Sequence, residues 1–268
     1  MICSSVLLFI FTQIYVLLKE IVISIQSYLE AHNFIVRNRL WKWILVPGII
    51  YAILVSVGIY FFMQSSNHVI DWLSNRIGLN DWLQEERNDW LNFFFVMMGI
   101  MLRLVLFLFY FSLFKYLVLI IGSPVFAYLS EKTESIMEGR DLSFSLKKFR
   151  EDAWRSIKQA LRNCLWQTVY FVAFIFMALL PLVGWIAPLV VVIVECYYYG
   201  FSMLDYSLTR QKFSPAASIR YIGNHRGLAI GNGTVFYFMH FIIIVGWVFA
   251  PAYAIIAATL SLYKSKTE

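Results

Sequence analysis

C-L-W-Q-T-V-Y-F-V-A-F-I-F-M-A-L-L-P-L-V-G-W-I-A-P-L-V-V-V-I-V-E-C-Y-Y-Y-G-F-S-M-L, residues 164–204, is the stretch that decides the fold. It is almost wholly apolar, and Pro181, Gly184 and Pro188 interrupt it near the middle. Proline lacks the amide hydrogen that a helix interior needs, and glycine favours a turn. The stretch therefore predicts two helices of about eighteen residues each, joined by a tight apolar turn, and each is marginal for crossing a bilayer.

The composition of the whole chain places this pair of helices in a membrane. The 268 residues are 60% hydrophobic and only 14% charged, with a mean hydropathy of +0.70. Soluble domains carry about 25% charged residues, because their surfaces must face water. This composition excludes the classes of soluble enzyme and predicts an all-α integral membrane protein.

Three further apolar runs complete the expected layout. Residues 43–63 match the length of about twenty residues that crosses a hydrocarbon core of ~30 Å. Residues 91–122 form a run of about thirty-two residues that must tilt or project. The last run, 234–263, is broken by Gly246 and Pro251 into arms of about thirteen residues, too short to cross as a pair. We therefore expect two crossing helices and two hairpins that enter the membrane and return.

The charges give this layout a direction. Segment 64–92 carries five acidic and two basic residues, whereas basic residues gather before residue 43, in block 147–162 and in segment 210–226. Because cytoplasmic loops accumulate Lys and Arg, we expect both termini inside and both hairpins entering from the cytoplasmic face. The net charge of +6 thus indicates topology and no nucleic-acid partner.

The first 33 residues differ from the rest of this single membrane domain, 1–268. Lys19, Glu20, Gln26 and Glu30 interrupt their apolar pattern, which favours a helix lying in the interface over a full span.

Basic residues precede the first crossing helix, where they oppose its dipole. The segment N-R-L-W-K consists of Asn38, Arg39, Leu40, Trp41 and Lys42. A helix N-terminus already carries about half a positive charge, so a bound anion would resolve the conflict. We take these five residues as the candidate anion site. The alternative is that the basic side chains reach lipid phosphates.

Three charged residues fall inside the apolar runs: Arg103 and Lys115 in the second, and Glu195 in the first hairpin. Charges within a membrane are costly and usually face a partner or a wet cavity. We expect Glu195 to pair with Arg103 or Lys115, either lining a pore or fixing helix packing. His240 is expected to be a packing residue rather than a proton relay.

No catalytic, cofactor or metal motif stands out, so the chain is not expected to be an enzyme. The histidines have no metal-ligand spacing, and Cys3, Cys164 and Cys196 are expected to pack among apolar residues. Gly227 and Gly231, four residues apart, indicate close helix packing.

Several motifs together resemble the CysZ-type sulfate permease family, which is related to the etoposide-induced membrane proteins. The segment I-I-G-S-P-V-F-A-Y-L-S-E-K-T-E-S-I-M-E-G, 120–139, resembles the motif that follows the family's second long helix. The matching positions, which continue along residues 34–263, are Pro124, Glu131, Glu134, Asp205 and Arg226.

The resemblance implies two long transmembrane helices and two partly penetrating hairpins, assembled as homo-oligomers in the bacterial inner membrane. It also implies sulfate import for cysteine synthesis, with a proton dependence, and a sulfate site at a Gly-x-Arg-Arg turn. Here Arg39 stands in place of that glycine and Trp41 in place of the first arginine, while Lys42 keeps the second basic position.

The sequence thus predicts a permease or channel for sulfate or a similar small oxyanion, with no cofactor. The alternative is a non-transporting scaffold that binds membrane lipids or protein partners. An integral-membrane enzyme acting on lipid is the third and least supported hypothesis.

Overall fold

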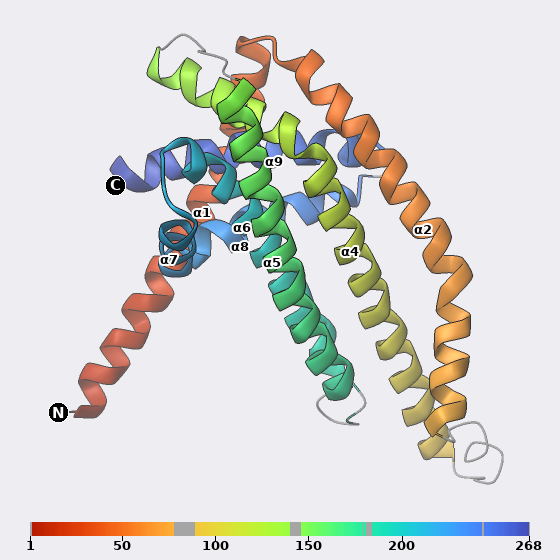
Figure 1. The fold of residues 1–268 in the computed structure, drawn as a ribbon. Helices are drawn as coiled ribbons and strands as arrows, with labels where there is room; N and C mark the ends of the chain where they lie inside the picture. The colour runs from red at the N-terminus through yellow and green to blue at the C-terminus, as the bar shows by residue number, and fades with distance from the viewer. Residues whose placement is uncertain are drawn as a thin grey trace.

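The computed structural model describes residues 2–77, 89–139, 146–178, 180, 184–242 and 244–267. Within these ranges the chain forms helices and no strand, which confirms the expected all-α membrane class. The elements, labelled as in Figure 1, are α1 (Ile2–Arg37), α2 (Trp41–Ile77), α4 (Asp89–Glu138), α5 (Leu146–Ala178), the 3-10 turn η1 (Gly184–Ile186), α6 (Ala187–Arg210), α7 (Pro215–Asn224), α8 (Arg226–His240) and α9 (Val245–Thr267).

Five helices of the described chain are long and apolar enough to cross a membrane. They cover Trp41–Ser65, Gly99–Glu138, Arg150–Ala178, Gly184–Arg210 and Val245–Lys266. The expected arms of about eighteen residues were wrong, because α5 has 33 residues and α6 has 24. By contrast, α8 has 15 residues and reaches only ~22 Å. Two crossing helices and two re-entrant hairpins therefore stay a prediction.

The two long helices expected from the sequence are α2 and α4, and they lie side by side (Figure 1). Helix α4 has 50 residues and contains Pro124, so the expectation that this proline follows the helix was wrong. A proline inside a membrane helix is tolerated where neighbours satisfy the freed backbone groups. One turn before the proline, the Tyr206 hydroxyl of α6 donates to the Leu119 carbonyl at 3.0 Å and holds α6 against this part of α4.

Helices α5 and α6 form the first predicted hairpin. The run breaks between Ala178 and Ala187, with Gly184 in η1 and Pro188 in the first turn of α6. The amide of Gly184 donates to the Leu180 carbonyl at 2.8 Å, which closes the turn. Because the break lies where Gly184 and Pro188 predicted it, its expected position is confirmed. The third predicted breaker, Pro181, lies outside the described residues.

Helices α8 and α9 form the second hairpin, but its break was predicted too late. Helix α8 ends at His240 and α9 begins at Val245, so Gly246 and Pro251 lie inside α9. Gly246 still serves the turn, because a Cβ there would lie 1.7 Å from the Met239 carbonyl oxygen. Pro251 lies only two turns into α9, where close neighbours bury it.

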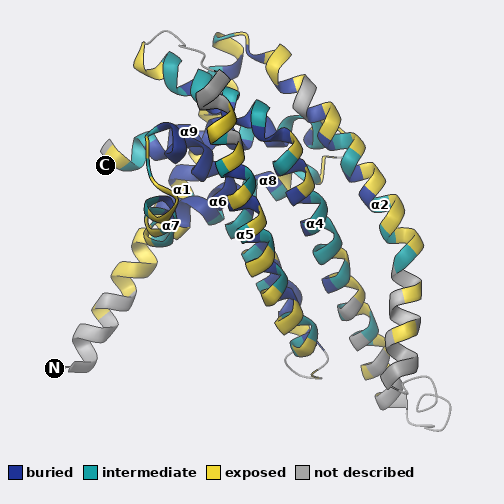
Figure 2. Ribbon diagram, in the orientation of Figure 1, coloured by how far each residue is buried: buried dark blue, intermediate teal, exposed yellow. Residues whose placement is uncertain are grey.

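The core surrounds α9 and α8, as Figure 2 shows by the dark blue ribbon. Helix α9 contacts α1, α2, α4, α6 and α8, and α8 lies between α1 and α6. A Cβ on Gly227 would lie 2.4 Å from the Leu17 carbonyl oxygen, and one on Gly231 2.8 Å from the Ser24 Cβ. The prediction that these two glycines allow close helix packing is confirmed.

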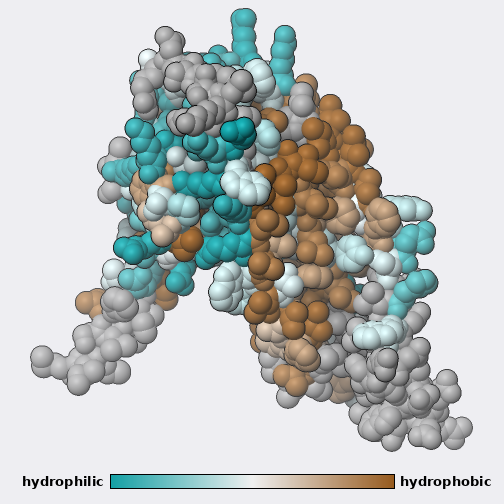
Figure 3. Space-filling model, in the orientation of Figure 1, coloured by the Kyte–Doolittle hydropathy of each residue, from teal (hydrophilic) through white to brown (hydrophobic). Residues whose placement is uncertain are grey.

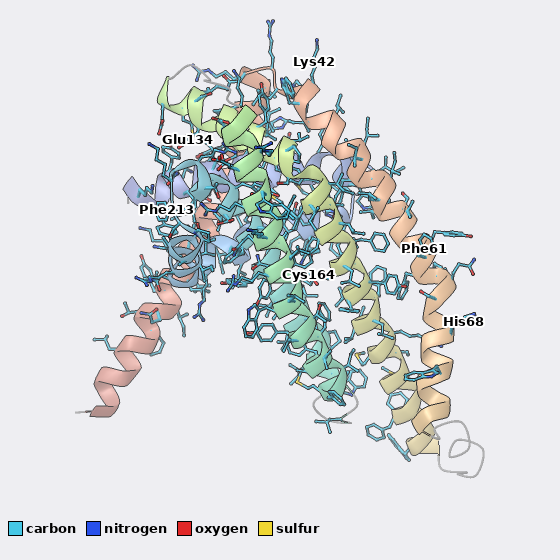
Figure 4. The ribbon with its side chains drawn as sticks, viewed as in Figure 1. Lys42, Phe61, His68, Glu134, Cys164 and Phe213 are labelled. Atoms are coloured by element: carbon cyan, nitrogen blue, oxygen red, sulfur yellow. The ribbon has the colours of Figure 1, made fainter. Side chains whose placement is uncertain are left out.

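The surface divides into two sides. In Figure 3 hydrophilic atoms gather on the side of α7 and the C-terminus, whereas hydrophobic atoms cover α2 and α4. Figure 4 places Lys42 at one end of α2 and His68 toward the other, so the basic turn and the part of segment 64–92 that belongs to α2 lie at opposite ends of this helix. Residues 78–88, which hold Asp81, Glu85 and Glu86, lie outside the described residues. The direction of insertion and the interfacial placement of residues 1–33 stay predictions.

Candidate anion site and membrane path

A buried ion pair joins α4 to α6. Lys115 Nζ lies 2.7 Å from Glu195 Oε2, and each residue is only 1% exposed. Gln167 of α5 accepts from Lys115 Nζ at 3.0 Å and donates to Glu195 Oε1 at 2.5 Å. The Tyr237 hydroxyl donates to Glu195 Oε2 at 2.6 Å, and the Tyr116 hydroxyl donates to Gln167 Oε1 at 2.6 Å. We call these five residues the central cluster.

The central cluster satisfies the requirement that a buried charge be paired and hydrogen-bonded. Of the two partners considered for Glu195, the structure brings Lys115 to it. Arg103 is exposed on α4 and lies twelve residues from Lys115, or ~18 Å along the helix. Arg103 is therefore no part of the central cluster.

A cavity of about 450 Å³ opens beside the central cluster, among α2, α4, α6, α8 and α9. Its walls are mainly apolar, with Phe107, Phe111 and Val192 among them, and Glu195 and Tyr237 give it a polar end. Ligand sites in proteins are commonly cavities of roughly 300–1,000 Å³ with a few placed polar groups. Glu195 thus lies between this cavity and the interior of the α4–α5–α6 bundle.

His240 also borders the cavity, and its hydrogen bonds fix its tautomer. Nδ1 lies 2.8 Å from the Phe236 carbonyl, which can only accept, so Nδ1 carries the hydrogen. Nε2 then accepts from the Tyr51 hydroxyl at 2.7 Å. Burial lowers the pKa of His240, on the short helix α8, to about 4. This neutral, fully bonded ring agrees with a packing role.

A second group of charges lies where α4, α5 and α6 meet at the other end of the bundle from the hairpin turn. Arg210 Nη1 lies 2.7 Å from Asp152 Oδ2 and 3.2 Å from Glu131 Oε2. Arg155 Nη2 lies 3.4 Å from Asp205 Oδ1. We call these five residues the end cluster. Two of the motif residues, Glu131 and Asp205, thus bind arginines that join helices.

The other motif residues have separate roles. Glu134 accepts from the Tyr263 hydroxyl at 3.1 Å, which links α4 to α9. Arg226 is exposed at the start of α8, where its Nε donates to the Gly223 carbonyl at 2.9 Å. Neither lies in the central cluster.

The proposed anion site forms the turn between α1 and α2. Arg39 and Lys42 are exposed, whereas Leu40 is buried and anchors the turn. Asn38 Nδ2 donates to the Phe34 carbonyl at 2.8 Å, so this amide caps α1. Trp41 packs edge-on against Phe249 of α9 with ring centroids 5.9 Å apart. Arg39 and Lys42 therefore remain the side chains that are placed to meet an anion.

Arg39 has a backbone conformation that glycine prefers. Its φ is +53°, in the left-handed region. This region costs a residue with a Cβ roughly 1–2 kcal/mol. The amide of Leu40 donates to the Ile35 carbonyl at 3.1 Å and closes the turn behind it. The turn thus has a backbone shape that glycine favours, and it carries the cationic side chain of Arg39.

Sequence reasoning missed Gln167, Tyr237 and the two arginines of the end cluster. A usable signal was present on α5, where Ser156, Gln159, Asn163 and Gln167 recur at spacings of three and four residues. Among the described residues, no group of three or more His, Cys, Asp or Glu could hold a metal ion.

Comparison with known proteins assigns the family. The profile described as Sulfate transporter CysZ/Etoposide-induced protein 2.4 matches residues 27–251. The chain belongs to this family. Proteins named Sulfate transporter CysZ from Pseudomonas aeruginosa strains LESB58 and PAO1 are each 24% identical to it over 242 residues, covering 89% of this chain and 94% of theirs. The protein of that name from Pseudomonas paraeruginosa gives the same figures.

Membership of the CysZ family confirms the resemblance carried by the motifs of segment 120–139. The α1–α2 turn of this chain has Arg39 in the left-handed conformation that glycine adopts readily.

Proposed function

We propose that this protein is a membrane permease for sulfate or a similar small oxyanion. Its support is the family, the names of its relatives and, above all, the central cluster, a buried set of polar groups beside a large cavity in an apolar protein. Polar groups within a membrane segment mark substrate paths or structural pairs.

In this proposal the oxyanion is first held at the α1–α2 turn, on the cytoplasmic side of the inner membrane. Arg39 and Lys42 attract it, and the first N–H groups of α2, which have no acceptor within the helix, donate to it. It then passes along the bundle to the central cluster and the cavity. We also propose that several copies of the chain assemble in the membrane. The molecular mass of the detergent-solubilised protein would give the number of copies.

The test is uptake of radiolabelled sulfate into liposomes that contain the purified protein. We expect uptake by the wild type and its loss in Arg39→Ala/Lys42→Ala. The matched control is Arg150→Ala/Arg220→Ala, which also removes two exposed cations and should keep uptake. Wild-type vesicles that take up no more sulfate than protein-free vesicles would contradict the permease and favour the scaffold.

A proton dependence is the finer part of this proposal, and it is assigned to Glu195. This carboxylate is the acidic group that borders the cavity. We expect an imposed proton gradient to change wild-type uptake, and Glu195→Gln with normal folding to abolish that response. An unchanged flux in this variant would show that the central cluster is only structural.

A further inference from the structure

The buried face of α5 is polar from Ser156 to Gln167 and apolar from there to the end of the helix. Ser156, Gln159, Asn163 and Gln167 are buried, and Phe171 continues the same face. The exposed face carries large apolar residues, among them Leu161, Leu165, Trp166, Val169, Val172 and Phe176. In a membrane this arrangement turns apolar groups to lipid and polar groups toward α4 and α6.

This polar face joins the two charged clusters. From Asp152 in the end cluster to Gln167 in the central cluster, fifteen residues of helix span ~22 Å. Gln159 and Asn163 lie between them, with no charge of their own. The three helices thus enclose a polar line that connects one end of the bundle to the cavity beside Glu195.

Along this line hydrogen-bond donors lack acceptors. Among the described residues, every buried side-chain nitrogen without a hydrogen-bond partner lies here: Arg155 Nε, Gln159 Nε2, Asn163 Nδ2, Arg210 Nε and Arg210 Nη2. Gln159 is 7% exposed and Asn163 is fully buried. A buried polar group without a partner is costly and uncommon, so these donors require a ligand or water.

A small cavity lies at this place. Its lining includes Ser156, Gln159 and Ser202, with Asp205 and Tyr206 on the α6 side, whereas Asn163 lies one turn further along α5, outside the lining. Its volume of about 10 Å³ holds no more than one water molecule. The Asp205 carboxylate faces Arg155, and the two carboxylates of the end cluster on α4 and α5 face Arg210. Asp152 Oδ2 lies 2.7 Å from Arg210 Nη1 as an ion pair, although it has no partner with hydrogen-bond geometry.

We propose that Gln159 and Asn163 form an inner subsite for the transported oxyanion, which rests on the proposed function. An oxyanion offers only acceptors, which is what these amide nitrogens lack. The two arginines of the end cluster face three carboxylates, so the surroundings offer no excess positive charge and the subsite holds an anion through amide dipoles alone. Such a subsite holds the ion weakly enough to release it, as conduction requires. The small cavity as it stands has room for one water molecule, so this proposal requires the seam between α5 and α6 to widen when the ion binds.

The test replaces one amide nitrogen by a carboxylate oxygen of the same shape. Asn163→Asp puts an acceptor where the oxyanion needs a donor, so sulfate uptake into proteoliposomes should fall by about tenfold or more. Sulfate binding at the Arg39–Lys42 turn, measured by calorimetry, should be unchanged. Asn224→Asp, the same change at an exposed position at the end of α7, is the control and should keep uptake.

A second variant keeps the test decisive if a buried carboxylate prevents folding. Asn163→Leu removes the donor without adding charge, and uptake should again fall, with a normal thermal midpoint. Unchanged uptake in either folded variant, beside a wild type that transports, would overturn the subsite and leave the permease standing. A wild type without uptake would instead contradict the proposed function.

Discussion

Helices α5 and α9 are both apolar enough to cross a membrane, yet they are buried in opposite ways. Of the most apolar window, 22% is buried in α5 and 72% in α9. Helix α9 is enclosed by five helices and packs through small residues such as Ala254, Ala257 and Ala258. Helix α5 contacts mainly α4 and α6, and presents its polar side chains to them.

Their polar groups differ in the same way. On α9 the Thr259 hydroxyl donates to the Ile255 carbonyl at 2.9 Å and lies 2.7 Å from Ser207 Oγ. On α5 the side-chain nitrogens of Gln159 and Asn163 have no partner. In this membrane protein the enclosed helix therefore holds the fold together, whereas the half-exposed helix carries the groups available for function.

The largest expected effect is on the central cluster. Lys115→Met leaves the Glu195 carboxylate buried without its cation, which should lower the free energy of unfolding by about 3–5 kcal/mol. The matched variant on α9 is Thr259→Val. It removes only neutral hydrogen bonds, so it should lower the free energy of unfolding by about 1 kcal/mol. Denaturant unfolding in detergent measures both.

The double variant Lys115→Met/Glu195→Gln is the control for this pair. It removes both charges and should recover most of the lost stability. A loss in Lys115→Met no greater than in Thr259→Val would show that the ion pair is not buried as described.

The second prediction compares the packing of the two helices. Ala257→Leu inserts a large side chain into the enclosed α9 and should cost about 1–3 kcal/mol. Ala173→Leu makes the same change on the exposed face of α5, where the effect should stay within about 0.5 kcal/mol. The thermal midpoints of the two variants measure these changes. Equal decreases in the two midpoints would mean that α5 is enclosed as tightly as α9.

The third prediction separates stability from transport at the α1–α2 turn. Arg39→Gly relieves the left-handed backbone and should raise stability by up to ~1 kcal/mol, although it removes a cation from the proposed anion site. Sulfate uptake should fall while the thermal midpoint rises. Changes along α9 should instead move both quantities together.

Arg37→Gly is the control for this change. It removes a cation of the same chain segment from the helical last turn of α1, so it should lower stability by about 0.5–1 kcal/mol. If Arg39→Gly also lowers stability, the turn is not strained.

The smallest effect concerns His240 of α8, which is bonded to the Phe236 carbonyl and the Tyr51 hydroxyl at the border of the cavity. Its pKa of about 4 lies below the ordinary value of 6.5, so the unfolded chain binds a proton there first as pH falls. Stability should be constant above pH 6.5 and decline as pH falls toward about 4, and His240→Gln should reduce this decline. Thermal melts over this range measure it.

Sulfate uptake, unlike stability, should not depend on His240. Between about pH 6 and pH 8 the ring is neutral, so the pH profiles of sulfate uptake should coincide for the wild type and His240→Gln. A shifted profile would make His240 a proton relay.

The sequence predicted the parts of the fold that depend on local rules. The first hairpin breaks where Gly184 and Pro188 stand, because proline and glycine act within a few residues. Pro124 and Pro251 were misjudged, because the neighbours that let a helix continue through a proline belong to distant segments.

The candidate site was only partly predictable for the same reason. Lys115 and Glu195 stood out because charges are rare in apolar runs. The choice of Lys115 over Arg103 was not predictable, because an almost uniformly apolar helix has no marked polar face to orient it. The spacing of Gln159 and Asn163 marks one polar face of α5, but the lack of acceptors for their amide nitrogens depends on packing against α4 and α6 and could not be predicted.

The most direct test of the contrast between α5 and α9 is the reactivity of single cysteines. In a protein with Cys3, Cys164 and Cys196 replaced by serine, Asn163→Cys and Ala257→Cys are each treated with a negatively charged methanethiosulfonate in proteoliposomes. The thiol on α5 should react, more slowly when sulfate is present, and the thiol on α9 should stay unmodified. Equal inertness of the two thiols would contradict a polar path along α5.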